Sequence, residues 1–464
     1  MSDLAIAQSS LTTSLLRYSR SWGLWLLLLV APVGARYMIP RADGGGMMIA
    51  IGQRLPVMTS PFLGISLGIV VSTLLLPIGW MYLRSNTNRR QPWQVEEVTA
   101  ASRIAIALGR FAADVVVLWG MLAALTVAGW ILGWFIEPVG GLNLYEITLG
   151  LWLVAAPALA GLAALRILFD ALPATRGGFG DFLYFVTWMA SLIAPMAAQG
   201  REASFAANMY DFAGFIRPLQ FGAPPGTNEF VIGNTPGLRP DKVDLDVMAG
   251  LFSPGYIGSR LAWVGIAIAV AALAGLLYRP HRATGRQIVP GRLARLSALG
   301  PPPAAVPGAP PAPFARLPVL GLFVAEFRLI AAGRLFKLLA IAVAVYAATA
   351  DFRHGSSAAG LLLLIFAMTA QAGRSEAKGL LALTATTATP PMLRRAAFLA
   401  AGTAWGLLLA LPAVLQAPVD QVLMLGAGGG LAVALVSMGL ALLSRSAFAP
   451  RLLLLLVWYG YLSS

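Results

Sequence analysis

The chain has 464 residues, of which 58% are hydrophobic and only 11% are charged, and its formal net charge is +14. A soluble domain carries about 25% charged residues, so this composition excludes an ordinary soluble fold and indicates that most of the surface faces lipid. The sequence contains no Cys, which excludes disulfides, thiolate metal sites and a cysteine nucleophile.

The first apolar stretch, from about Ser21 to Ile39, predicts a membrane-spanning helix. The run Val33-Gly34-Ala35 also fits the cleavage site of a signal peptide. A long polar segment precedes the stretch and further spans follow at once, which favours a helix that is retained. The segment from Leu11 to Arg20 before it fits an amphipathic helix or simply an ordinary helix start.

Ten further apolar stretches follow. A bilayer core of about 30 Å needs about 20 apolar residues per helix. Five of the stretches complete a first group of six, and five weaker, Ala-rich stretches form a second group, the last of them short. Their approximate limits are Phe62–Leu83, Phe111–Phe135, Ile147–Phe169, Phe182–Ala198 and Leu261–Tyr278, then Phe336–Ala350, Ala358–Ala372, Ala396–Leu415, Gln421–Leu443 and Leu452–Leu462. The sequence therefore predicts an all-α polytopic membrane protein with about 11 spans, within a range of 10 to 12.

The distribution of Lys and Arg predicts the orientation of these spans. With the N-terminus in the cytoplasm, most of the 33 basic residues fall in cytoplasmic segments, as the positive-inside rule requires. The two histidines, His281 and His354, then lie in opposite compartments, which argues against a two-His metal site. No basic run is interleaved with aromatic residues, so a nucleic-acid partner is not indicated.

The connections divide the chain into two membrane units. Residues 1–278 form the first, six-helix unit, which includes an external segment over residues 199–260 with several Asp near its end. Residues 279–317 form a basic and Pro-rich cytoplasmic linker. Residues 318–464 form the second unit of about five helices, and the mixed apolar and charged stretch Leu317–Ile330 predicts an interfacial helix at its start.

Pairing residues 285 positions apart indicates an internal duplication. This offset sets Val98-Thr99-Ala100-Ala101-Ser102 against Leu383-Thr384-Ala385-Thr386-Thr387, and it sets Arg110 against Arg395. Each segment precedes an apolar span on the cytoplasmic side. Chance matching of Ala-rich sequence explains the similarity equally well.

Few residues in the spans are suited to chemistry. Asp114 is the carboxylate inside a predicted span, and pairing with Arg110 four residues earlier explains it better than proton transfer does. No nucleophile constellation is visible, and none of the three Lys follows a Gly, so the chain lacks the phosphate-binding loop of an ATPase. Four glycines in G-x-x-x-G spacing predict close helix packing, namely Gly64, Gly68, Gly402 and Gly406.

The first unit has a distinct order of elements: an interfacial N-terminal helix, six spans, a cytoplasmic loop between spans two and three, and a larger external segment between spans five and six. The stretch ahead of span three runs from Glu96-Glu97 to Gly109-Arg110. In this order, and most closely in this stretch, the unit resembles the membrane subunits of the ABC-2 class of ABC transporters. The counterpart in the second unit, from Arg374 to Arg395, lacks the Gly before Arg395, and that unit lacks a long external segment and a clear sixth span.

This resemblance implies a permease subunit without enzymatic activity that exports an amphipathic or hydrophobic substrate across a bacterial inner membrane. It implies that ATP and Mg²⁺ bind to a separate ATPase subunit, expected in two copies, with a second permease copy or an auxiliary subunit as a further partner. The residues expected to contact the ATPase are Glu96, Glu97, Arg103, Arg110, Arg374, Glu376, Lys378, Arg394 and Arg395.

Two other functions fit the sequence. An ion-coupled secondary transporter would work without an ATPase and would depend on Asp114. A membrane scaffold or assembly factor would bind a stable partner without moving a substrate. Neither the substrate nor the direction of transport follows from the residues.

Overall fold

The computed structural model describes residues 2–21, 24, 25, 28, 36, 49–51, 54–90, 101–176, 178–195, 202–224, 230–232, 239–278, 318–349, 352–373, 390–444 and 448–462. The chain separates into two compact units, an N-terminal unit (Met1–Arg176 with Gly180–Gln287) and a C-terminal unit (Ile288–Ser464 with Gly177–Phe179).

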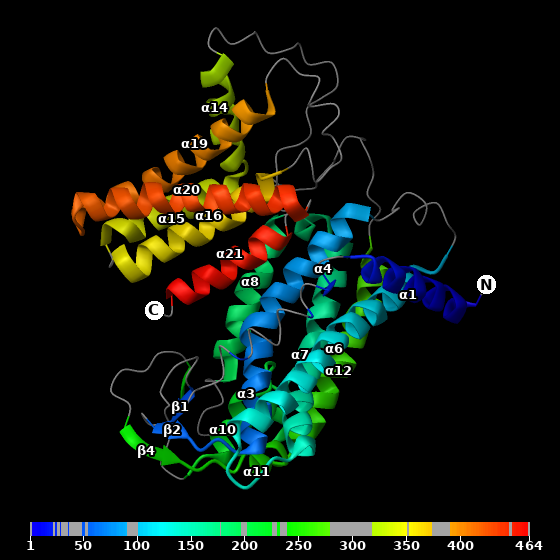
Figure 1. Cartoon of the computed structure of the whole chain (residues 1–464). Coiled ribbons are helices and arrows are strands. Elements are labelled where there is room, and N and C mark those ends of the chain that lie inside the picture. The colour runs from blue at the N-terminus through cyan, green and yellow to red at the C-terminus, as the bar shows by residue number, and fades with distance from the viewer. Residues whose placement is uncertain are drawn as a thin grey trace. The chain divides into compact units, whose positions relative to one another are not determined.

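The N-terminal unit is a helical bundle with a small sheet at one end (Figure 1). The side chains of its long helices are almost all apolar. A helix also satisfies its own backbone hydrogen bonds, which a buried or lipid-facing segment requires. They are α3 (Ser60–Val70) continuing through η1 (Val71–Leu75) into α4 (Leu76–Arg90), α6 (Arg103–Ile136), α7 (Leu144–Ala171), α8 (Gly178–Ile193) and α12 (Tyr256–Leu277).

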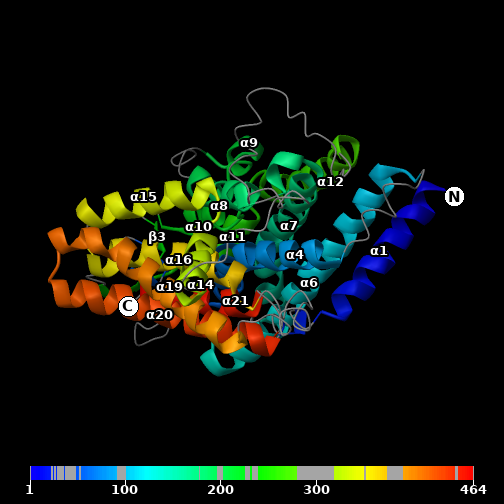
Figure 2. The ribbon, with the colours of Figure 1, turned by 90° about the horizontal axis from the view of Figure 1, so that it is seen from above.

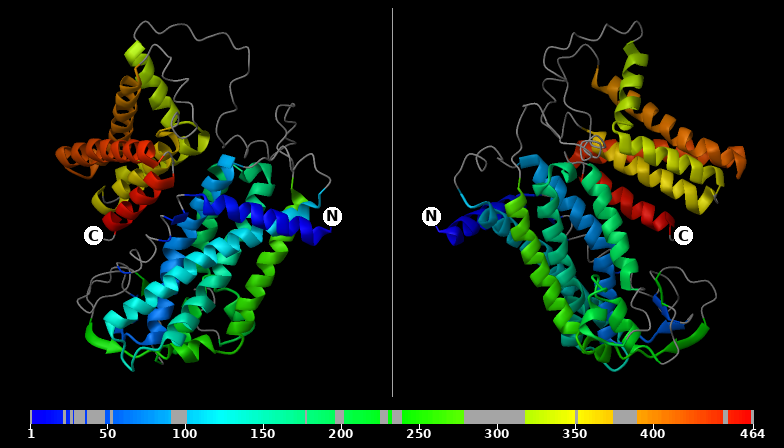
Figure 3. Two further views of the ribbon diagram at one scale, coloured as in Figure 1. Left: turned by 45° about the vertical axis from the view of Figure 1, so that its right-hand side comes forward. Right: turned by 180° about the vertical axis from the view of Figure 1, so that it is seen from behind.

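Helix α1 (Asp3–Ser19) lies across the bundle at the end remote from the sheet, as Figures 1 and 3 show. It runs beside α6 when seen from above (Figure 2). The two helices approach closely at Gly109, where a Cβ atom would lie 2.3 Å from the carbonyl oxygen of Ala7. Any side chain at position 109 would therefore push α1 away from the bundle.

The external segment forms the opposite end of the unit. It contains the short helices α9 (Phe205–Asn208), α10 (Ile216–Gly222) and α11 (Val247–Leu251) and the strands β3 (Phe230–Ile232) and β4 (Arg239–Val243). These strands join β1 (Ile49–Ile51) and β2 (Arg54–Pro56) in a sheet of order β3-β1-β2-β4, in which only β2 and β4 are parallel. The sequence analysis did not predict this sheet, because three-residue strands are too short to show an alternating pattern.

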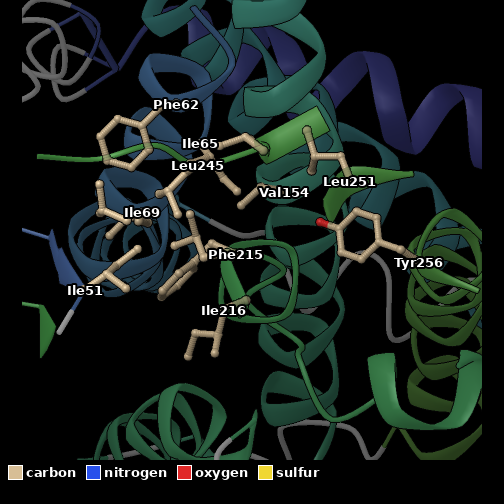
Figure 4. Packing of buried hydrophobic residues seen from close by; sticks show 14 residues of the cluster. Ile51, Phe62, Ile65, Ile69, Val154, Phe215, Ile216, Leu245, Leu251 and Tyr256 are labelled. Atoms are coloured by element: carbon tan, nitrogen blue, oxygen red, sulfur yellow. The ribbon is translucent and has the colours of Figure 1, made fainter. Parts of the chain in front are cut away.

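A buried apolar cluster attaches this segment to the bundle. Figure 4 shows Ile51 of β1, Phe62 of α3 and Val154 of α7 packed around Phe215 and Leu251 of the external segment. Burial of this kind stabilises by about 25 cal/mol per Å² of apolar surface. The external segment is therefore a packed part of the N-terminal unit.

Buried polar contacts fix the external segment as well. The Asp211 carboxylate accepts hydrogen bonds from the backbone N–H groups of Gly214 and Arg217, each at 2.8 Å. Arg260 of α12 donates to the carbonyl oxygens of Asn208 and Phe212 at 3.3 and 3.2 Å. Since Gly214 has a φ of 85° and lies against Arg260, the turn requires a glycine.

The C-terminal unit consists of α14 (Pro318–Ile330), α15 (Arg334–Thr349), η4 (Phe352–Ser356) leading into α16 (Ser357–Gln371), α19 (Pro391–Ala410) with η5 (Leu411–Leu415), α20 (Val419–Ser444) and α21 (Phe448–Leu462). Helix α14 meets α15 at an angle of 85°. Gly333 between them has a φ of 110°, which accounts for the sharp turn. Helices α19 and α20 run side by side (Figure 2).

The helical membrane fold is confirmed, whereas the number of spans is not. Six helices of the described residues are long and apolar enough to cross a membrane, and seven if α14 and α15 count as one bent span. Every predicted span after the first coincides with a helix, but α8, α15, α16 and α21 have only 15 or 16 residues. At 1.5 Å per residue they reach about 24 Å, short of a bilayer core of about 30 Å. Most of the first predicted span lies outside the described residues.

Candidate functional site

A buried cluster of charged residues occupies the end of the N-terminal unit where α1 meets the bundle. Its centre is Asp114 of α6, which is fully buried. The Asp114 carboxylate accepts a hydrogen bond from the Tyr18 hydroxyl of α1 at 2.6 Å and from Nε of Arg166 of α7 at 2.8 Å. Nη2 of Arg166 donates to the same carboxylate oxygen. One carboxylate thus connects three helices.

The cluster continues from Arg166 towards α4 and α8. Nη1 of Arg166 donates to Asp170 one turn later in α7 at 2.9 Å. Arg84 of α4 binds the other oxygen of Asp170 at 3.1 Å and Asp181 of α8 at 3.0 Å. Its Nη2 also donates to the carbonyl oxygens of Thr175 and Arg176, each at 2.9 Å. These bonds join the ends of five helices in one network.

Aromatic rings cover the α4 and α8 side of this network. The Trp80 ring stacks on Tyr184 with centroids 4.0 Å apart and almost parallel planes. The Trp80 indole N–H donates to Asp181 at 3.0 Å, and the Arg84 guanidinium lies 5.4 Å from the centre of the Trp80 ring. Such rings exclude water, so the charges interact in a medium of low dielectric constant.

The protonation state of Tyr18 follows from its burial. Removal from water raises the pKa of the Tyr18 hydroxyl well above its usual value, and the neighbouring Asp114 carboxylate raises it further. The hydroxyl therefore stays protonated and donates its hydrogen bond to Asp114. Its neutral donor role suits a structural clamp that fastens α1 to α6.

A cavity adjoins the cluster between α6, α7 and α12. It encloses about 520 Å³ of space that is partly open to solvent. The charged and aromatic side chains that line it are Arg103, Arg110, Arg166, Asp170 and Tyr278, and the rest of the lining is apolar. Nη1 of Arg103 donates to the carbonyl oxygen of Tyr278 at 3.3 Å. The guanidinium groups of Arg103 and Arg176 lie 6.0 and 5.5 Å from the centre of the Tyr278 ring.

The residues predicted to contact an ATPase differ in their exposure to solvent. Arg103 is exposed at the start of α6, whereas Arg110 is only 8% exposed and lines the cavity. Arg394 and Arg395 lie half-buried in the first two turns of α19. The others, Glu96, Glu97, Arg374, Glu376 and Lys378, lie outside the described residues.

The predicted pairing of Asp114 with Arg110 differs from the observed one, since Asp114 pairs with Arg166. The four-residue spacing on α6 made the Arg110 pair plausible, but the packing of α7 against α6 places a second guanidinium directly at the carboxylate. Arg84, Arg166 and Asp170 were not among the predicted site residues. Arg166 could have been found from the sequence, because it is a charged residue inside a predicted span and such residues are costly there unless they are paired.

The four glycines predicted to pack helices lie at close helix contacts. A Cβ atom on Gly64 would lie 2.5 Å from the backbone oxygen of Ile147 of α7, and one on Gly68 would lie 2.7 Å from Val154. A Cβ atom on Gly406 of α19 would lie 2.2 Å from the backbone oxygen of Gly426 of α20, and one on Gly402 would lie 2.8 Å from the Ala434 side chain. Glycine is thus required where α19 and α20 nearly touch.

Among the described residues, no group of three or more His, Asp or Glu is arranged to hold a metal ion. The charged cluster is built from guanidinium and carboxylate groups that bind one another. Its arrangement can hold helices together and attract an anion, and it offers no activated nucleophile.

None of the protein families, characterised proteins or solved structures compared with the chain matches it.

Proposed function

We propose that this chain is the membrane subunit of an ATP-driven transporter of the ABC-2 class, located in a bacterial inner membrane, and that it exports an amphipathic or hydrophobic substrate. The observation that carries the proposal is the order of elements in the N-terminal unit. Helix α1 lies across the bundle end, and a folded segment lies between α8 and α12. The unit implied by the resemblance has an interfacial helix and a larger external segment at the same points in the order of elements.

The C-terminal unit supports the proposal by repeating part of the helix packing of the N-terminal unit. Helix α14 packs on α19 as α1 packs on α6, and α16 and α19 both pack on α20 as α3 and α6 pack on α7. Helix α21 packs on α16, while α8 bonds to the backbone of η1 and α4. We infer that the two units arose by duplication and act as two linked permease-like units, the second without a sixth span.

A detailed feature recurs in both units. A π-helical turn, η1 over Val71–Leu75, lies within the second predicted span of the first unit, and another, η4 over Phe352–Ser356, directly precedes the second predicted span of the second unit. A π-turn disturbs the regular backbone bonds. In the first unit a Trp from the fifth predicted span donates to a carbonyl within the turn, and in the second unit the corresponding Trp donates to a carbonyl two residues after it. Trp188 donates to Ser72 at 2.8 Å, and Trp458 donates to Ala358 at 2.7 Å. Ser72 and Ala358 are 286 positions apart, one more than the offset that pairs Arg110 with Arg395.

In this proposal basic and acidic residues that precede the third span of each unit contact the ATPase. Arg103 is the described residue of the first set that is exposed for this purpose, and Glu96 and Glu97 precede it in the sequence. Arg110 is buried and lines the cavity, so in this proposal we leave it out of the contact surface. The second set is Arg394 and Arg395 together with Arg374, Glu376 and Lys378 of the preceding loop.

Copurification tests the proposal directly. The tagged chain, isolated from its native membranes, should bring with it a second chain that carries a G-x-x-x-x-G-K-[ST] loop and hydrolyses ATP. The variants Glu97→Lys and Arg103→Glu should lower the amount of this partner, whereas Arg239→Glu on the exposed strand β4 should not. A chain that transports without such a partner would instead be a secondary transporter, and a stable partner without substrate flux would indicate a scaffold.

The contacts of Asp114 are also relevant to the alternative function, that of a secondary transporter. A proton-coupled carrier needs a carboxylate that gains and loses its proton during transport. Both oxygens of the Asp114 carboxylate are already bound, one by the Tyr18 hydroxyl and the other by Arg166. The observed contacts therefore favour a structural role for Asp114.

A further inference from the structure

The cavity between α6, α7 and α12 has a composition that the permease role does not require. Its lining contains three guanidinium groups, those of Arg103, Arg110 and Arg166, and one carboxylate, that of Asp170. The remaining surface comes from apolar side chains such as Ile106, Ile167 and Ala274. A ligand that fits this lining carries a negative charge at one end and an apolar part at the other.

The position of the cavity along the helices further narrows the range of ligands that could bind there. Arg103 begins α6, Asp170 lies in the last turn of α7 and Tyr278 follows the end of α12. The cavity thus lies at the end of the bundle where a membrane-spanning helix reaches the headgroup layer, on the side that the basic residues predict to be cytoplasmic. The apolar residues Leu273, Leu276 and Leu277 of α12 are exposed next to this end, which places lipid chains beside the cavity.

The charges around the cavity favour a phosphate group. Arg166 is held by Asp114 and Asp170, whereas Arg103 is exposed and uses Nη1 on a backbone carbonyl. Guanidinium groups bind phosphate oxygens through several parallel hydrogen bonds. Basic pockets between membrane helices on the cytoplasmic side bind anionic lipid headgroups by this chemistry.

We propose that this cavity binds the phosphate group of an anionic phospholipid of the cytoplasmic leaflet, with Arg103 and Arg110 as the phosphate-binding side chains and the acyl chains lying along α12. Bound lipid would join α6 and α12 at the end where α1 is clamped. This inference does not depend on the proposed transporter function, because it concerns the isolated chain.

The test uses the full chain, purified in detergent without a partner and titrated with phosphatidylglycerol while bound lipid is counted by native mass spectrometry. Arg103→Gln should raise the dissociation constant about fivefold, the effect expected for one basic residue near a membrane surface. Arg103→Lys retains the charge and should bind more tightly than Arg103→Gln. Arg239→Gln, an exposed change at the opposite end of the unit, should bind as the unchanged protein does.

Two further titrations separate the sources of the phosphate. Phosphatidylcholine, which has no net charge, should bind at least tenfold more weakly than phosphatidylglycerol. Inorganic phosphate at millimolar concentration should not displace phosphatidylglycerol. Equal affinity of the unchanged protein and Arg103→Gln for phosphatidylglycerol would overturn the site, and displacement by inorganic phosphate would overturn the assignment to lipid.

Discussion

Replacement of Asp114 by Asn tests whether the buried cluster holds the N-terminal unit together. Asn has nearly the same shape as Asp but no charge, so the substitution leaves the Arg166 guanidinium beside a neutral amide in a fully buried position. Arg166 keeps its bond to Asp170, and Tyr18 keeps an oxygen acceptor at position 114. The change therefore removes charge from the centre of the cluster without creating a cavity.

The expected loss in the free energy of unfolding follows from the burial of both Asp114 and Arg166. Removing one member of a buried ion pair costs about 3–5 kcal/mol, because the remaining charge stays out of water. Since the Asn oxygen still accepts the hydrogen bond of Tyr18 and Arg166 keeps Asp170 as a partner, we expect the lower end of this range, about 3 kcal/mol. Arg166→Gln should cost at least as much, because it leaves the carboxylates of Asp114 and Asp170 without their shared cation.

The assay is unfolding of the purified chain in mixed micelles by increasing SDS, followed by Trp fluorescence. The double variant Asp114→Asn/Arg166→Gln should lose at least about 1.5 kcal/mol less than the sum of the single losses, as coupled residues do. Asp244→Asn, an exposed Asp of the external segment, is the control and should change stability by less than about 0.5 kcal/mol. Additive single losses, or an Asp114→Asn protein as stable as the control, would refute this role for the pair.

Five further substitutions, in three groups, test helix packing and buried hydrogen bonds in the two units. Gly406→Ala places a Cβ atom 2.2 Å from a backbone oxygen of α20 and should destabilise the C-terminal unit by about 1–3 kcal/mol in the same assay. Gly428→Ala, whose Cβ atom meets no atom within 4 Å, should stabilise the unit by up to about 1 kcal/mol. Equal effects of the two substitutions would contradict the close contact at Gly406. Tyr18→Phe should cost about 1 kcal/mol at pH 8. Because burial raises the pKa of Tyr18, the native state keeps a proton that the unfolded state loses above about pH 10. The stability of the unchanged protein therefore falls as the pH rises beyond that value, and the stability of Tyr18→Phe should fall less. Trp188→Phe and Trp458→Phe should each cost about 1 kcal/mol through the lost bond to a carbonyl beside a π-turn, and an effect in only one unit would argue against equivalent roles.

Much of the helical framework was predictable because apolar runs report helix position directly. The predicted stretch Phe111–Phe135 lies within α6, and Ile147–Phe169 lies within α7. The lengths were less predictable, since apolar character continues into turns and η segments that no longer form regular helix. The sheet of β1 to β4 was missed because its strands come from distant parts of the chain and each has only three to five residues.

In the charged cluster, too, one residue was predictable from the sequence and its partner was not. The sequence identified Asp114 as an unusual residue in a span and selected Arg110 as its partner, because spacing along one helix is all that a sequence displays. The observed partner, Arg166, is 52 residues away and reaches Asp114 only because α6 and α7 pack side by side. Tyr18 joins them from α1 for the same reason.

The sequence by itself determined that the chain is a multi-pass helical membrane protein, because hydrophobicity and the loop charges depend on residue type alone. It also located the glycines that allow α19 and α20 to approach. Only the tertiary structure decided which charges meet, which arginines line the cavity and which remain exposed. Those properties depend on side chains from different helices, and their distances are set by packing that no local pattern encodes.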